Sequence, residues 1–439
     1  MCASFAAPAR PSCDLPTRDR AFNDTPPMLL RFSLILCSAQ LAAAPGSKLS
    51  LDDAIRAAWT NDPTTAALAL APQLSRAREV QAGLAPKPGL ELRGAVPVKG
   101  DSEWSMGVGI SRLVPRRERI DLARAYARLG GESAALALGE RRRLLAGEVR
   151  RLWYELAVQR ARRDSARHSV ELQADLTRKL QGRRAAGEMG DAEWELLQLE
   201  LTRAGHALAA AQAEVAAGEE RLVRKLRLPS DHPRVFETGL DELLLRTLAP
   251  EDRLPLTRPE IALADLEVRR AEAALALARG QSRGDWSVGA GIDVERRSND
   301  ATGRLATEPR LSMTASAPWP GGPAANRGEI LEREASLRIA EADLQARRDE
   351  IAAELGAAIA AVRGSQPAVR NYRALLLSAE DLPRKLAPAY ARGEVSGLQM
   401  AQALQQRVAI ESDFLAAVSR YLSLLAEAET ATGLIPTLL

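Results

Sequence analysis

Hydrophobic residues recur with two different spacings along this chain of 439 residues, one typical of strands and one typical of helices. In four short stretches apolar and polar residues alternate, and this period of two is typical of strands with one apolar face. The other face carries Ser, Thr, Gly, Asp and Glu, so we expect it to meet water. The predicted strands lie at about 89–98, 104–114, 285–296 and 310–319. Their apolar face includes Trp104, Met106, Val108, Ile110, Trp286, Val288, Ile292, Leu311 and Met313.

Most of the remaining chain carries a helical period. It predicts long helices at about 119–181, 191–226, 327–390 and 397–432. The first contains no proline and, at 1.5 Å per residue, would reach about 95 Å, which no compact domain needs. The third contains prolines that predict kinks or breaks, at Pro367, Pro383 and Pro388.

The second and fourth long helices carry apolar residues at alternating spacings of four and three, the heptad pattern of packed helices. In the second helix the seam is unbroken: Leu197, Leu201, Ala204, Leu208, Ala211, Val215, Gly218 and Leu222. The fourth helix keeps the seam except at Arg407: Ala403, Ile410, Phe414, Ala417, Tyr421, Leu424 and Ala428. Because many seam residues are small, the long helices are predicted to pack closely side by side.

An internal repeat organises the chain. Residues 62–96 align without a gap to 258–292, and residues 185–198 align to 391–404. Two matches in the same order, both with their patterns preserved, predict a tandem duplication. Each repeat would hold one shorter helix, two strands and two long helices. The expected boundaries are a first repeat at 45–230, a connecting segment at 231–255 and a second repeat at 256–439.

The N-terminus has the features of an export signal. After Met28, a cation at Arg31 precedes an apolar run to Leu36 and small residues through Ala44. We therefore expect residues 1–44 to be a leader and signal peptide; a cytosolic tail followed by a short buried helix is the alternative. All three cysteines fall in this segment: Cys2, Cys13 and Cys37. The mature chain would then contain neither a disulfide nor a cysteine metal site.

Composition and charge exclude several function classes. The charged residues are nearly balanced, with a net charge of +3, so nothing indicates a nucleic-acid-binding surface. Aromatic residues make up only 4% of the chain, which is not typical of a thick globular core. The histidines lie far apart and have no metal-ligand neighbour at helical spacing: His168, His206 and His232. No phosphate-binding loop or nucleophile elbow occurs. We therefore predict no enzyme and no cofactor or metal, and interpret the arginine-rich stretches 139–144 and 160–167 as solvated helix faces.

The predicted strands form two hairpins nearly two hundred residues apart, each between long helices. Strands of about ten residues with one apolar face suit an outer-membrane barrel. Four strands cannot close a barrel, because the smallest have about eight, and open sheet edges are not tolerated in lipid. The predicted barrel is therefore shared between chains. A small sheet packed on a helix is the alternative.

The order of these features resembles the TolC-like outer-membrane efflux proteins, from "LSLDDAIRAAWTNDP" (49–63) to the stretch 390–436, which contains "YARGEVSGLQMAQAL". The passage "SAPWPGGPAANRGEI" (316–330) is similar to the cobalt–zinc–cadmium export branch of that family. The resemblance implies a homotrimer in the outer membrane: a barrel of twelve strands, four per chain, continued by a coiled-coil barrel of long helices across the periplasm. It also implies a periplasmic membrane-fusion adaptor and an inner-membrane efflux pump as partners.

The resemblance assigns roles to the turns between the long helices. They would be the periplasmic tips that dock the adaptor, with Gly187, Glu188 and Met189 in one and Gly393, Glu394 and Val395 in the other. In the family, acidic residues after the second turn ring the pore aperture. The matching positions here are the uncharged Gln399 and Gln402. Glu193, the first-repeat equivalent of Gln399, could supply a carboxylate ring that favours cations, or be an ordinary acid in a first helical turn.

The predicted function is a passive exit duct for an efflux system, with heavy-metal cations as the favoured cargo and drug efflux or type I secretion as alternatives. A periplasmic coiled-coil scaffold without a pore is the alternative from a different class. It would explain the heptads and the signal peptide but not the amphipathic hairpins.

Overall fold

The computed structural model describes residues 49–96, 104–187, 189–229, 239–245, 258–281, 284–298, 305–317, 326–392 and 394–433. All of them belong to one unit, residues 46–439. The predicted leader at 1–44 lies outside the described residues, as does most of the connecting segment at 231–255.

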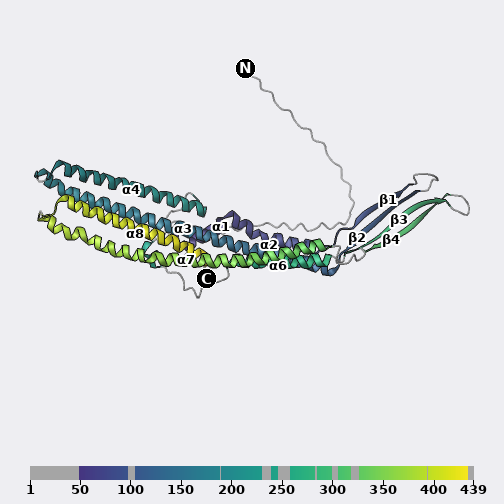
Figure 1. Ribbon diagram of the computed structural model, residues 1–439. Helices are drawn as coiled ribbons and strands as arrows, with labels where there is room; N and C mark the ends of the chain where they lie inside the picture. The colour runs from purple at the N-terminus through teal and green to yellow at the C-terminus, as the bar shows by residue number, and fades with distance from the viewer. Residues whose placement is uncertain are drawn as a thin grey trace, which may run out of the picture. The chain divides into compact units, whose positions relative to one another are not determined.

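Helices make up most of the described chain (Figure 1). The shorter ones are α1 (Leu51–Asn61), α2 (Pro63–Ala82), α5 (Leu240–Leu245) and α6 (Pro259–Gln281). The long ones are α3 (Arg117–Ala185), α4 (Asp191–Leu226), α7 (Arg327–Ala391) and α8 (Gly397–Ala431). The four predicted long helices are therefore confirmed, each within a few residues of its expected ends.

One expectation about helix continuity is wrong in part and another is wrong. The expected breaks at the prolines do not occur, because α7 runs as one helix of 65 residues through all three of them. A proline removes one backbone hydrogen bond, and packing of α7 against α8 and α6 helps to hold the helix. The single helix expected before the first strand is instead two, because Asp62 ends α1 and its side chain caps α2 by accepting the amide of Thr65 at 3.1 Å.

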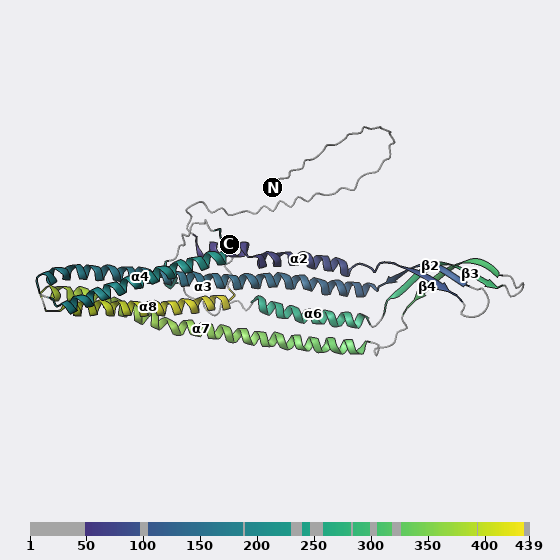
Figure 2. The same ribbon diagram turned by 90° about the horizontal axis from the view of Figure 1, so that it is seen from above.

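The helices are arranged in two sets along the length of α3. Toward the sheet, α2 and α6 pack on α3, and α7 packs on α6 (Figure 2). Toward the other end, α4 packs on α3, and α8 lies between α3 and α7. The predicted heptad seams make these contacts, since every seam residue of α4 and α8 is buried or half-buried. Arg407, the interruption of the seam, is buried too and lies 3.9 Å from Glu411.

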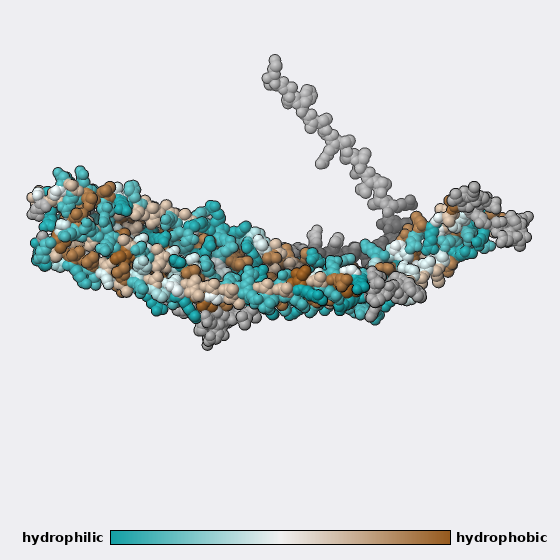
Figure 3. All heavy atoms as spheres, in the orientation of Figure 1, coloured by the Kyte–Doolittle hydropathy of each residue, from teal (hydrophilic) through white to brown (hydrophobic). Residues whose placement is uncertain are grey.

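The core sits where α3, α4 and α8 meet α1. Its largest fully buried side chains include Trp153, Tyr154, Leu222 and Leu425. A second cluster lies near the far ends of the long helices: Leu176, Leu180, Leu197, Met400, Ala401 and Leu404. On the face in Figure 3, apolar patches also alternate with polar ones along the outside of the helices.

A buried network of ion pairs and hydrogen bonds joins α3, α6 and α8 and corrects the interpretation of the stretch 139–144. Arg143 of α3 is only 4% exposed; it donates to Glu140 at 2.6 Å, to the carbonyl of Thr430 at 2.6 Å and to Glu260 at 3.2 Å. Glu260 also pairs with Arg258 at 2.8 Å, and burial raises the pKa of its carboxyl group. Arg143 is thus a structural core cation rather than part of a solvated face.

The strands form one antiparallel sheet in the order β1-β2-β3-β4. Their bounds are β1 (Gly89–Ala95), β2 (Trp104–Val114), β3 (Trp286–Ser298) and β4 (Leu305–Ser316). The two hairpins join through β2 and β3, which pair from Trp104 with Arg296 to Val114 with Trp286. Within this chain β1 and β4 are therefore the edges of the sheet.

The expected start of the fourth strand, at 310, is wrong. The β4 strand begins at Leu305, and its first residues pair in register with the end of β3, down to Leu305 opposite Ser298. This segment breaks the alternation, because Thr307 and Pro309 fall on the otherwise apolar face and Ala306 falls on the polar one. The first strand also ends earlier than predicted, at Ala95.

The sheet is tied to the helices where β3 and α3 begin. Asp285 forms an ion pair with Arg119 and accepts the backbone amide of Arg116 at 3.4 Å. The guanidinium of Arg116 donates to the carbonyl of Gly284 at 3.2 Å. These contacts fix the end of the sheet from which the long helices depart (Figure 1).

Candidate functional site

One face of the sheet is apolar across all four strands. The pairing places Leu92, Val108, Ile292 and Leu311 in one row and Leu90, Ile110, Ala290 and Met313 in the next. These side chains point away from the protein, and the large ones are all exposed. Eight of the nine residues predicted on this face are exposed, and Trp104 is half-buried. The sheet therefore does not pack on a helix of the same chain, contrary to the alternative considered from the sequence.

Cations and tryptophans lie at the two ends of this apolar face. Trp104 stands opposite Arg296 at the far end of the sheet, and Val114 stands opposite Trp286 at the end near the helices. Arg112 lies on the same face, opposite Val288, in the row next to that of Val114 and Trp286. The tryptophans were predicted on this face and the two arginines were not, although the same alternation, continued to Arg112 and Arg296, places them there.

The opposite face is polar and carries a bridge from one edge strand to the other. Arg93 of β1 donates to Ser312 Oγ of β4 at 3.3 Å and lies 3.1 Å from Glu91 and 3.9 Å from Asp293. In a flat sheet, three strand spacings would separate β1 from β4 by about 14 Å, beyond the reach of an arginine side chain. The bond therefore requires a sheet curled around its polar face.

Small residues make this bridge possible. Gly107, Gly109, Gly289 and Gly291 lie on the polar face of β2 and β3, between the two edge strands. A Cβ atom at Gly107 would overlap the carboxylate of Asp293, and one at Gly109 would lie 3.1 Å from Arg93 Nη2. The glycines thus leave the space in which the Arg93 side chain crosses the sheet.

The tips of the long helices form the second candidate site. In the turn after α3, Gly187 has a φ of 74°, which favours glycine, and Met189 packs against the second core cluster. In the turn after α7, Arg392 donates to Glu394 at 2.7 Å and keeps the pKa of that carboxyl below its ordinary value. Val395 is half-buried. Two predicted tip residues, Glu188 and Gly393, lie outside the described residues.

The structure brings the predicted aperture residues together at the tips. Glu193 of α4 accepts the backbone amide of Leu398, in the first turn of α8, at 3.1 Å. The side chain of Gln399 is turned back to accept the amide of Ser396 at 2.8 Å, completing a capping box, and Gln402 is exposed one turn further on. Glu193 therefore caps a neighbouring helix, a role that neither reading of the sequence included.

Arginine–aromatic contacts also join the tips. The guanidinium of Arg183 lies 4.9 Å from the ring centre of Tyr390, which links the end of α3 to the end of α7. Arg184 lies 4.9 Å from the ring centre of Trp194 and 3.4 Å from Asp191, both at the start of α4. These contacts were not predicted from the sequence, because only the folded hairpins bring the residues together.

The part of the chain that the structure describes offers no constellation for catalysis or metal binding. No group of three or more His, Cys, Asp or Glu residues there could hold a metal ion. His168 and His206 are exposed, and His232 lies outside the described residues. Among the described helices, none has the length and apolar character needed to cross a membrane.

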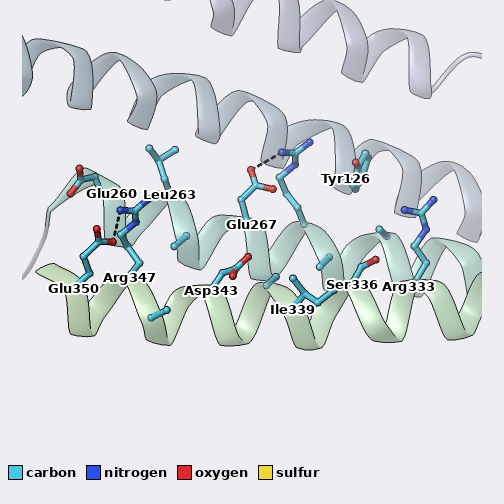
Figure 4. A pocket seen from close by; sticks show the side chains of 16 residues that line it. Tyr126, Glu260, Leu263, Glu267, Arg333, Ser336, Ile339, Asp343, Arg347 and Glu350 are labelled. Atoms are coloured by element: carbon cyan, nitrogen blue, oxygen red, sulfur yellow. Dashed lines mark hydrogen bonds and ion pairs between the residues drawn. The ribbon is translucent and has the colours of Figure 1, made fainter.

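A groove of about 850 Å³ lies along α6 and α7. Figure 4 shows acidic and basic side chains of both helices around it, together with Leu263 and Ile339. Two of its ion pairs, Glu267 with Arg270 and Arg347 with Glu350, join residues three positions apart on one helix, at 2.7 Å each. Such pairs are ordinary on a solvated helix surface.

No protein-family model matches the sequence, and no curated protein matches it. The fold is similar to that of solved channels. A structure of CusC, described in connection with transmembrane channel formation, has a TM-score of 0.69 at 17% identity over 87% of this chain and 91% of that chain. The outer membrane protein VceC of Vibrio cholerae has a TM-score of 0.65 at 14% identity, over 87% of this chain and 96% of that chain.

The Campylobacter jejuni CmeC outer membrane channel is also similar, with a TM-score of 0.65 at 13% identity over 87% of this chain and 85% of that chain. At these identities the likeness concerns the fold. The chain thus has the fold of TolC-family outer-membrane channels: mainly helical, with a small sheet of four antiparallel strands. This part of the sequence-based prediction is confirmed.

Proposed function

We propose that this chain is the protomer of a trimeric outer-membrane channel, the passive exit duct of a tripartite efflux system. The observation that carries the proposal is the exposed apolar face of a sheet whose edge strands have no partner within the chain. Exposure of such an apolar face to water is unfavourable, and the unpaired backbone groups of such edges are unfavourable in lipid. Both problems disappear if copies of the chain pair edge to edge in a membrane.

The dimensions of the sheet suit a bilayer. The 11 residues of β2 would extend about 36 Å along the strand, or about 25 Å across the membrane at a tilt of 45°. Trp104 and Trp286 lie near the two ends of this span. Tryptophans at both borders of an apolar band are typical of outer-membrane barrels.

The curvature of the sheet supports the same arrangement. The bridge from Arg93 to Ser312 requires curling around the polar face, so a closed barrel would hold the polar face inside and the apolar face outside. Two chains would supply eight strands and three would supply twelve, both closable numbers. The resemblance to the TolC-like proteins, which implies a homotrimer, favours three.

The helices would continue the barrel into the periplasm. The 69 residues of α3 span about 100 Å, and the tips at Gly187–Met189 and Gly393–Val395 would dock a membrane-fusion adaptor coupled to an inner-membrane pump. At this end Glu193, Gln399 and Gln402 would line the aperture. Glu193→Gln should then weaken cation selectivity, and Gln399→Asp should strengthen it. A duct of this kind needs neither a catalytic group nor a cofactor.

Heavy-metal cations are the cargo we favour, from the likeness of residues 316–330 to the cobalt–zinc–cadmium export branch. Drug efflux and type I secretion use the same architecture and are the alternatives. Export would require the predicted signal peptide within residues 1–44.

Single-channel recording tests the proposal against a scaffold without a pore. The full chain, expressed with its own leader, is extracted from outer membranes with detergent and added to planar lipid bilayers. The duct should give stable conductance steps. Recovery in the periplasmic fraction without detergent, together with silent bilayers, would support the scaffold instead.

A further inference from the structure

The Arg93 bridge lies where the proposed duct would expose it to cargo. Its guanidinium is held above the glycines of β2 and β3 by Ser312, Glu91 and Asp293, which come from three different strands. The Arg93 side chain remains 35% exposed, so water and small ions can reach it. A cation fixed by three partners keeps its position in the lumen, unlike a flexible surface arginine.

The charges on this face are nearly balanced. Across β1 to β4 it carries the acids Glu91, Asp293, Glu295 and Glu308 and the bases Arg93, Arg297 and Arg310. The face thus has one net negative charge per chain. Loss of Arg93 would double it, at the level where the bridge crosses the sheet, and the change would repeat in every copy around the barrel.

We propose that Arg93 is a selectivity-determining residue of the duct, whose fixed positive charge offsets the lumenal carboxylates and lowers the preference of the barrel for cations. The proposal rests on the proposed function, because only a pore makes this face a lumen. Fixed charges within about one Debye length, about 8 Å at physiological salt, dominate the potential that a passing ion meets. Rings of charged side chains set ion preference in this way in other pores.

The test is the reversal potential of single channels in a potassium chloride gradient, measured for the full-length protein and its variants. Arg93→Gln should shift it toward the potassium equilibrium potential. Arg310→Gln is the matched control, because it removes an equal charge from the same face. Arg310 is 65% exposed and pairs with Glu295 at 3.1 Å, outside the bridge, so solvent screens its charge more and we expect a smaller shift.

A second pair of variants moves the guanidinium without changing the charge. Gly109→Ala would place a Cβ 3.1 Å from Arg93 Nη2, whereas Gly89→Ala on the same face would meet Ser111 Oγ at an ordinary 3.6 Å. We expect Gly109→Ala to shift the reversal potential in the same direction as Arg93→Gln, and Gly89→Ala to leave it unchanged.

The outcomes separate this proposal from the proposed function. If the unmodified protein forms no channels, the duct itself is wrong. If it conducts but Arg93→Gln leaves the reversal potential unchanged, or shifts it no more than Arg310→Gln does, Arg93 is an ordinary lumenal charge and the present proposal is overturned.

Discussion

Large apolar side chains are buried in the helical core and exposed on the sheet. In the core, Trp153 is 1% exposed and is enclosed by helices of its own chain. In the sheet, Met313 is 79% exposed, and its neighbours in the same row are exposed as well. The helical part therefore completes its packing within one chain, whereas the sheet does not. The exposed face of the sheet is the surface that lipid and other copies of the chain would cover in the proposed channel.

The largest expected effect comes from opening the core. Trp153→Ala should lower the free energy of unfolding by about 3–5 kcal/mol, because it leaves a cavity among fully buried side chains. Thermal unfolding followed by circular dichroism of the detergent-extracted protein measures the change. Trp153→Phe keeps an aromatic ring and should cost clearly less. An unchanged melting temperature for Trp153→Ala would show that the core is not completed within the chain.

The next effect compares two neighbouring residues of β4 that face opposite ways. Met313→Arg puts a charge on the apolar face and should cost about 2–4 kcal/mol of insertion free energy near the bilayer midplane. Thr314→Arg adds the same charge to the polar face and should be tolerated. The amount of each variant in the outer membrane, relative to the unmodified chain, measures the difference. Equal amounts of the two would contradict the assignment of the faces.

A smaller loss of stability is expected from changing Asp62, which lies between α1 and α2. Arg141, at 3.1 Å, and Thr65 hydrogen-bond to Asp62 and lower its pKa to about 2. Because the folded-state pKa is depressed, this stabilisation is present above the ordinary pKa of 3.8 and is lost as the pH falls toward 2. Asp62→Ala should cost about 1–2 kcal/mol at neutral pH. Denaturant unfolding between pH 2 and 7 should show a smaller loss toward low pH in this variant than in the unmodified protein.

The smallest effect is expected at the tips, where one hydrogen bond joins the side chain of Glu193 to the first turn of α8. Glu193→Gln removes the charge that caps α8 and should weaken the cap by about 0.3–1 kcal/mol. Hydrogen exchange at the amide of Leu398 should become faster. Glu195→Gln, on an exposed residue of the same helical turn, is the control and should leave exchange unchanged. Equal protection in both variants would mean that Glu193 does not cap α8 in solution.

Much of this comparison could be predicted from the sequence because it depends on local periodicity. The heptad seam from Leu197 to Leu222 gave the packed side of α4, and strict alternation gave the two faces of the strands. The tertiary contacts could not be predicted. The pairing of β2 with β3 joins segments far apart in the chain, and the first residues of β4 break the alternation and include Pro309.

The site was predictable to a similar degree. Alternation placed residues on the correct face, but the crossing of Arg93 to Ser312 requires all four strands and their glycines together. At the tips, the Gly-containing turns were visible in the sequence, whereas the bond from Glu193 to Leu398 depends on how two hairpins meet. Local patterns thus identified the elements, and the contacts between distant elements needed the fold.

The mass of the protein extracted from the outer membrane tests most directly the claim that copies of the chain complete the sheet. The protein is solubilised in a mild detergent and analysed by light scattering with the detergent contribution subtracted. We expect one species with three times the mass of the mature chain, found only in the detergent extract. A single-chain mass, with the protein released in the aqueous periplasmic fraction, would contradict it.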